Sequence, residues 1–165
     1  MEPYLFYSSA TVAVIASLAA ITRRDAMHAI LYLVVALIAS ALLFFLLGAP
    51  FVAALQIIVY AGAIIILFLF VVMMVNPPAS SRGTLWRGWF GPLLLTSVLA
   101  VQWSFLLGSD TEMLAASPVG PTLLGQTLFK DYAFALQLVA IFLLVGLVGA
   151  YHIGRKDREP TPEGP

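Results

Sequence analysis

The sequence predicts an all-α, polytopic membrane protein, and three observations support this fold class. Of the 165 residues, 62% are hydrophobic and only 10% are charged, against about 25% charged residues in an ordinary soluble domain. The apolar residues fall in five continuous stretches, each close to the roughly 20 residues that a helix needs to cross a bilayer. Such stretches are too long for the strands of a membrane barrel, which take about 10 residues and alternate in polarity.

The five stretches define the predicted elements in chain order. The first is interpreted as a retained helix and not as a signal peptide, because acidic Glu2 precedes it where a signal peptide would be basic. Residues 1–151 are therefore expected to form a single five-helix transmembrane domain, and residues 152–165 a short cytoplasmic tail. The predicted spans are residues 3–21, 26–47, 51–75, 90–107 and 134–151.

The connections between the spans predict how the helices are arranged and oriented. The first two are so short that the first three spans should pack as antiparallel neighbours. The long connection, residues 108–131, is expected to be irregular or to hold a short surface helix, and Lys130 is its only basic residue. Because basic residues favour the cytoplasmic side, the N-terminus is predicted outside and the C-terminus inside. The basic residues predicted inside are Arg23, Arg24, Arg82, Arg87, Arg155, Lys156 and Arg158.

Composition also excludes several kinds of chemistry. The chain has no cysteine, which removes disulfides, iron–sulfur clusters and thiolate nucleophiles, and its net charge of zero gives no electrostatic footprint for nucleic acid. His28 and His152 both fall near the inner surface, where a haem-ligating pair is one interpretation and ordinary interfacial histidines are the plainer one. No aspartate, glutamate, lysine or arginine lies within the spans, so this chain alone is not expected to carry charge across the bilayer.

Uncharged polar residues do lie within the spans, and each needs a hydrogen-bonding partner there. Gln56 and Tyr60 are four residues apart, on one face of a regular third helix, and the fifth span carries Gln137. The plainer interpretation of such residues is that they join neighbouring helices. The same interpretation applies to the polar residues of the fourth span, Thr96, Ser97 and Gln102.

The third span has a predicted weak point at its centre. A regular helix over residues 51–75 would be about 37 Å long, which exceeds the hydrocarbon thickness of about 30 Å. Gly62 stands between two alanines, with β-branched residues on both sides that stiffen their segments. Its missing side chain is compatible with a kink or π-bulge that acts as a conformational switch, or with a close-packed helix crossing.

These residues resemble a known family. The run of residues 54–64, ALQIIVYAGAI, with its continuation over residues 67–74, closely resembles the subunit J family of bacterial NADH–quinone oxidoreductase, respiratory complex I. The mitochondrial counterpart of that family is NADH dehydrogenase subunit 6. The similarity includes residues 28–33, 44–49 and 151–155, and it extends over roughly residues 1–77 and 128–158.

The resemblance implies a non-catalytic subunit in the membrane arm of a proton-translocating enzyme of the bacterial plasma membrane. FMN, iron–sulfur clusters, NADH and quinone would belong to partner subunits, and this chain would bind no cofactor or metal. Its neighbours would be a small glutamate-bearing subunit and the subunit of the quinone module. In this family the third helix is thought to alternate between a π-bulged and an α form, which would move the side chains at Tyr60 and Phe68 and open or close a water path for protons.

The sequence departs from some family members at two positions. They carry glutamate where this chain has Gln56 and Gln137, and glutamine cannot take up a proton near neutral pH. A water-ordering or packing role is therefore expected at both positions. The alternative functions are a membrane subunit of a cation/proton antiporter or membrane-bound hydrogenase, and a stand-alone structural membrane protein.

Overall fold

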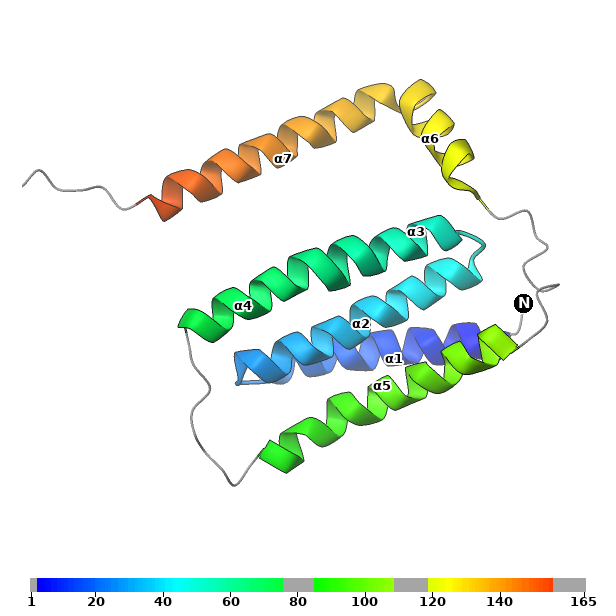
Figure 1. Ribbon diagram of the computed structural model, residues 1–165, viewed down its shortest axis with the longest axis vertical. Coiled ribbons are helices and arrows are strands. Elements are labelled where there is room, and N and C mark those ends of the chain that lie inside the picture. The colour runs from blue at the N-terminus through cyan, green and yellow to red at the C-terminus, as the bar shows by residue number, and fades with distance from the viewer. Residues whose placement is uncertain (1–2, 76–84, 109–118, 156–165) are drawn as a thin grey trace, which may run out of the picture. The chain divides into compact units, whose positions relative to one another are not determined.

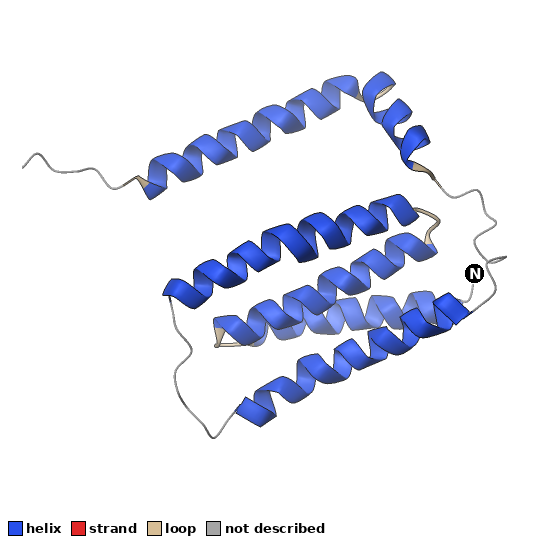
Figure 2. Ribbon diagram, viewed as in Figure 1, coloured by secondary structure: helices blue, strands red, loops and turns tan. Residues whose placement is uncertain are grey.

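The computed structural model describes residues 3–75, 85–108 and 119–155, and within these ranges it is helical with no strand (Figures 1 and 2). The predicted all-α class is therefore confirmed. Residues 76–84 between the third and fourth predicted spans, residues 109–118 of the long connection, and residues 156–165 of the predicted tail lie outside the described residues. The helices are α1 (Pro3–Thr22), α2 (Ala26–Leu46), α3 (Pro50–Leu55), π-helix η1 (Gln56–Ile64), α4 (Ile65–Val75), α5 (Leu85–Gly108), α6 (Pro121–Lys130) and α7 (Ala133–Gly154).

Four of the five predicted spans correspond to a helix that is long and apolar enough to cross a membrane. Among the described residues, α1, α2, the continuous helix Pro50–Val75 and α7 are long and apolar enough to cross a membrane. The continuous helix consists of α3, η1 and α4. The fourth predicted span lies within α5, whose apolar part, Phe90–Leu106, is shorter.

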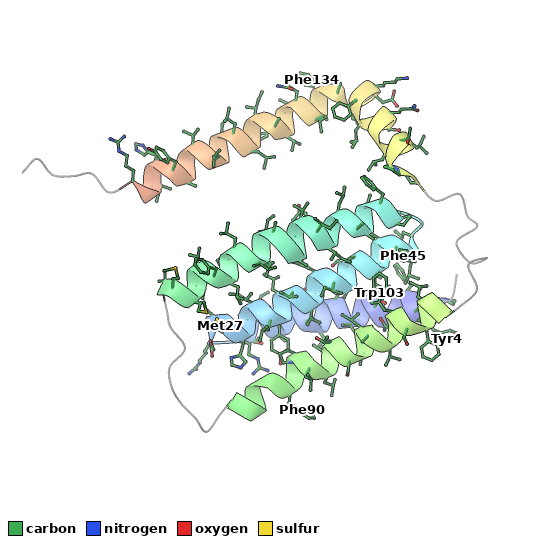
Figure 3. All side chains as sticks on the ribbon, in the orientation of Figure 1. Tyr4, Met27, Phe45, Phe90, Trp103 and Phe134 are labelled. Carbon is green, nitrogen blue, oxygen red and sulfur yellow. The ribbon has the colours of Figure 1, made fainter. Side chains whose placement is uncertain are left out.

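The core of the first unit, residues 1–120, lies among α1, α2 and α5. Ala16 and Ala39 are fully buried there, and small residues at such positions let helix backbones approach closely in a membrane. At one end of the α2–α5 contact, the rings of Phe45 and Trp103 lie 5.8 Å apart (Figure 3). The larger core residues are Val12, Val35, Leu42 and Leu99.

Two tight turns make α1, α2 and α3 antiparallel neighbours, as the short connections predict (Figure 1). Asp25 caps the start of α2, since its carboxylate accepts the Met27 N–H at 3.0 Å. Gly48 ends the second turn with φ of 83°, a left-handed conformation that favours glycine. The Gly48 carbonyl also accepts the Val119 N–H at 3.1 Å, so the long connection meets this turn at residue 119.

The second unit, residues 121–165, contains α6 and α7. Helix α6 is the short helix that one interpretation of the long connection predicts. Only Asp131 and Tyr132 separate the two helices, and both of their N–H groups donate to the Thr127 carbonyl. This turn directs α6 steeply away from the axis of α7, beside Phe134 (Figure 3).

Candidate functional site

The third span contains a nine-residue π-helix, Gln56–Ile64, between two α-helical parts. The Ile65 N–H donates to the Tyr60 carbonyl, five residues back, and also to the Gly62 carbonyl. This i→i−5 pairing widens the helix and rotates the side chains that follow it, relative to an α-helix. Of the two interpretations of the weak point at Gly62, the structure has the bulge.

Glycine fits this backbone for a specific reason. A Cβ added at Gly62 would lie 3.2 Å from the Ile57 carbonyl oxygen, which is tighter than an ordinary van der Waals contact. No other described atom beyond the adjoining helix backbone lies within 4 Å of it, so Gly62 is not packed against a second helix. The close-packed crossing, the other interpretation, is therefore absent from the described part of the chain.

The predicted site residues of this span leave their polar and aromatic groups without partners in the described chain. Tyr60 is 51% exposed and Phe68 is 50% exposed. Gln56 is half-buried, and neither its amide nor the Tyr60 hydroxyl hydrogen-bonds to any residue that the structure describes. No residue of η1 is buried. Gln56 and Tyr60 are thus available for contacts outside the described chain.

Gln102 of α5 behaves in the opposite way. It is 7% exposed, and its Nε2 donates to the Ser8 hydroxyl at 2.9 Å. The Ser9 hydroxyl lies 2.9 Å from Gln102 Oε1 and 2.7 Å from the Leu5 carbonyl. For Gln102 the plainer interpretation, a polar contact that joins helices, is correct. Gln137, on α7, is exposed.

A second polar cluster, where α1 meets α2, was not predicted from the sequence. The Arg23 guanidinium donates to the Tyr32 hydroxyl at 3.0 Å and lies 4.9 Å from the centre of that ring. A Cβ at Gly91 of α5 would overlap this hydroxyl, so glycine makes room for the contact. In the sequence, Arg23 precedes α2 and Tyr32 lies nine residues later within it. No local sequence pattern indicates that these two side chains are in contact.

His28 lies in the first turn of α2. Its Nδ1 lies 2.8 Å from an Asp25 carboxylate oxygen, and this hydrogen bond is the main cause that lowers the pKa of Asp25 below its ordinary value. The described partner of His28 is thus the Asp25 side chain. Among the residues that the structure describes, no group of three histidine or acidic side chains is arranged to hold a metal ion.

A family model and individual relatives both relate this chain to subunits of NADH–quinone oxidoreductase. A family model described as NADH-ubiquinone/plastoquinone oxidoreductase chain 6 matches residues 16–153. The chain is 40% identical to NADH-quinone oxidoreductase subunit J of Escherichia coli K12, over 94% of this chain and 88% of that protein. It is 42% identical to the subunit J protein of Pseudomonas aeruginosa PAO1, over 93% and 97% of the two chains. The subunit J protein of Buchnera aphidicola from Schizaphis graminum is 31% identical, over 94% and 99%.

Proposed function

This chain belongs to the family of NADH-ubiquinone/plastoquinone oxidoreductase chain 6, and on that premise we infer that it is a membrane subunit of NADH–quinone oxidoreductase, respiratory complex I. The observation that carries this function is similarity, over 93–94% of this chain, to relatives that are named as subunit J. Other subunits of the complex are its partners. We further propose that the complex lies in the bacterial plasma membrane and translocates protons.

The proposed topology has five spans, with the N-terminus outside and the C-terminus inside. The hydrogen bond between the Val119 N–H and the Gly48 carbonyl supports this count. Gly48 follows the second span and Val119 follows the fourth, so a shared side requires that the chain crosses and returns between them. Helix α5 is 24 residues long, or about 36 Å at the α-helical rise, which is enough for the return.

The proposed contribution of the chain is conformational coupling, without catalytic residues of its own. In this proposal the third span converts between its π form and a regular α form as quinone is reduced. The conversion rotates Tyr60 and Phe68 relative to Gln56, whose amide orders water but does not take up a proton near neutral pH. The π-helix at Gln56–Ile64 is the observation that supports this role.

Redox chemistry and proton uptake then belong to partner subunits. FMN, iron–sulfur clusters, NADH and quinone are expected on those subunits, since the chain has no cysteine to hold a cluster. The proposed neighbours are the small subunit with buried glutamates and the subunit of the quinone module. Their carboxylates would titrate, and the third span of this chain would control whether water connects them.

The test is a purification through a tag on the C-terminal tail after mild solubilisation of native membranes. We expect the eluate to contain flavin and iron–sulfur subunits and to oxidise NADH with reduction of quinone, in a reaction blocked by a quinone-site inhibitor. Recovery with antiporter chains or hydrogenase subunits would instead support the alternative function. Recovery of the chain alone, without redox activity, would support a stand-alone membrane protein.

A further inference from the structure

Helix α6 has an apolar face formed by Leu124 and Leu128, although Leu123 and Phe129 lie outside that face. Leu124 and Leu128 are four residues apart and therefore share one face, while Gln126 lies on the opposite face. Leu124 and Leu128 are half-buried and Gln126 is exposed, but Leu123 and Phe129, which lie outside that face, are exposed as well, at 56% and 71%. The half-buried face is directed toward the start of α7, where Leu136 is also half-buried.

The turn between α6 and α7 constrains where α6 lies. Helix α7 has 22 residues, about 33 Å, which matches the hydrocarbon core of about 30 Å. It is therefore long enough to cross the membrane, where spanning helices are tilted by about 20° on average. Because α6 leaves the α7 axis steeply after only two residues (Figure 1), α6 must run close to the membrane plane, at the surface where α7 begins.

We propose that α6 is an interfacial helix that inserts its Leu124–Leu128 face into the boundary between lipid headgroups and acyl chains. The occupant of that face is the phospholipid surface, because the face is continuous with the membrane-spanning surface of α7. An amphipathic helix of this kind buries its apolar face about 5–10 Å into the boundary. Lys130 is followed directly by Asp131, so apolar burial and not headgroup charge supplies the binding. Helix α6 then fixes the depth of α7 in the bilayer.

The absence of cysteine from this chain makes a direct test available. Leu128→Cys and the matched control Gln126→Cys are introduced separately, and native membranes are treated with a maleimide that adds mass. Any shift of this chain on a denaturing gel then reports the introduced thiol alone. We expect the control thiol to react at least about tenfold faster, since burial of the other in the bilayer withholds it from water. Equal rates would overturn the proposal by placing both faces in solvent.

A second measurement distinguishes lipid from a protein neighbour. The unsubstituted complex is reconstituted into phosphatidylcholine vesicles whose acyl chains carry a photoreactive diazirine, and lipid adducts are mapped on this chain by mass spectrometry. Adducts on Leu124 and Leu128, with none on Gln126, are the expected result. A protected Leu128→Cys thiol without lipid adducts would show that protein, whether α7 or a partner subunit, covers the face and would overturn the proposal.

Neither readout depends on NADH oxidation, so the failure of this inference can be distinguished from failure of the proposed function. If the Leu128→Cys chain does not assemble, the photolabelling of the unsubstituted chain decides the question by itself.

Discussion

Two glutamines of this chain, Gln102 and Gln56, lie in predicted spans but have opposite surroundings. Gln102 is buried among α1, α2 and α5, and both ends of its amide meet serine hydroxyls of α1. Gln56 begins the π-helix, is half-buried, and has no hydrogen bond to any described residue. An amide in hydrocarbon requires partners. The first glutamine therefore holds this chain together, and the second is available to water or to another subunit.

The same contrast extends to the backbone around each glutamine. The core of α1, α2 and α5 has fully buried alanines and lies among helices of the α type. The third span has an irregular turn without a buried residue, although it packs along α2. Regions that move in a protein are drawn from those with few buried contacts. The comparison therefore predicts that substitutions in the core change assembly, whereas substitutions in η1 change coupling.

The largest effect is expected for Ala39→Leu, with Ala63→Leu as its matched control. Ala39→Leu adds volume at a fully buried position of the α2 core, where overpacking costs about 1–3 kcal/mol or more. We expect the amount of this chain in membranes, measured by immunoblot, to fall several-fold. Ala63→Leu, on the exposed side of η1, should leave that amount unchanged. Equal loss from both variants would contradict the division into two regions.

The next effect concerns Gly62. In Gly62→Val the new Cβ meets the Ile57 carbonyl in the π form, so the equilibrium should shift away from that form by about tenfold for each 1.4 kcal/mol of strain. Protons pumped per NADH oxidised should fall strongly, and Gly62→Ala should cause a smaller loss. The measurement is proton uptake in membrane vesicles beside NADH–quinone turnover. If pumping and turnover both stay normal in Gly62→Val, the switch hypothesis is wrong.

A moderate effect separates the two glutamines themselves. Gln102→Ala removes contacts worth about 0.6–2 kcal/mol within a membrane, and the Ser9 hydroxyl keeps the Leu5 carbonyl as an acceptor. The thermal midpoint for loss of this subunit should drop by a few degrees with pumping unchanged. Gln56→Ala should leave that midpoint unchanged and lower pumping modestly. Complete loss of pumping in Gln56→Ala would contradict a role limited to ordering water.

The smallest effect is expected where α1 meets α2. Loss of the cap in Asp25→Ala should cost about 0.5–2 kcal/mol, and Asp25→Asn should cost less because asparagine also caps helices. Since the pKa of Asp25 is lowered in the folded chain, its contribution is present above the ordinary carboxyl value of about 3.9 and is lost as the pH falls through the lower, folded value. Thermal midpoints should therefore show no contribution from Asp25 to pH dependence between about pH 5 and 8.

Hydropathy predicts most of the helix boundaries, and the boundary that it misses, the start of α5, has a physical cause. The predicted spans 3–21 and 26–47 differ by a single residue from α1 and α2 at their C-terminal ends. Helix α5 begins at Leu85, whereas the predicted span begins at residue 90. Hydropathy reports which residues suit the bilayer, and a helix can continue into the interface without such residues.

Side-chain pairings could not be predicted in the same way. Gln102 and its serine partners are separated by more than ninety positions in the chain, so only the packing of α1 against α5 brings them together. The bulge was one of two interpretations of the small residues around Gly62. The two differ in whether another helix approaches that glycine, which a single sequence does not encode locally.

The proposed conversion of the π-helix to a regular α-helix would require α4 to rotate about its own axis. Removing one residue from the wide turn would rotate everything after it by about 100°, the angle between successive α-helical residues. Ile65, the first residue after the turn, is buried in a helix that packs against α2. This rotation would move the Ile65 side chain out of its buried position and bring a neighbouring side chain of α4 into that position. Because a buried position accepts only one side chain at a time, α4 would move between two packed orientations in discrete steps and not by gradual twisting.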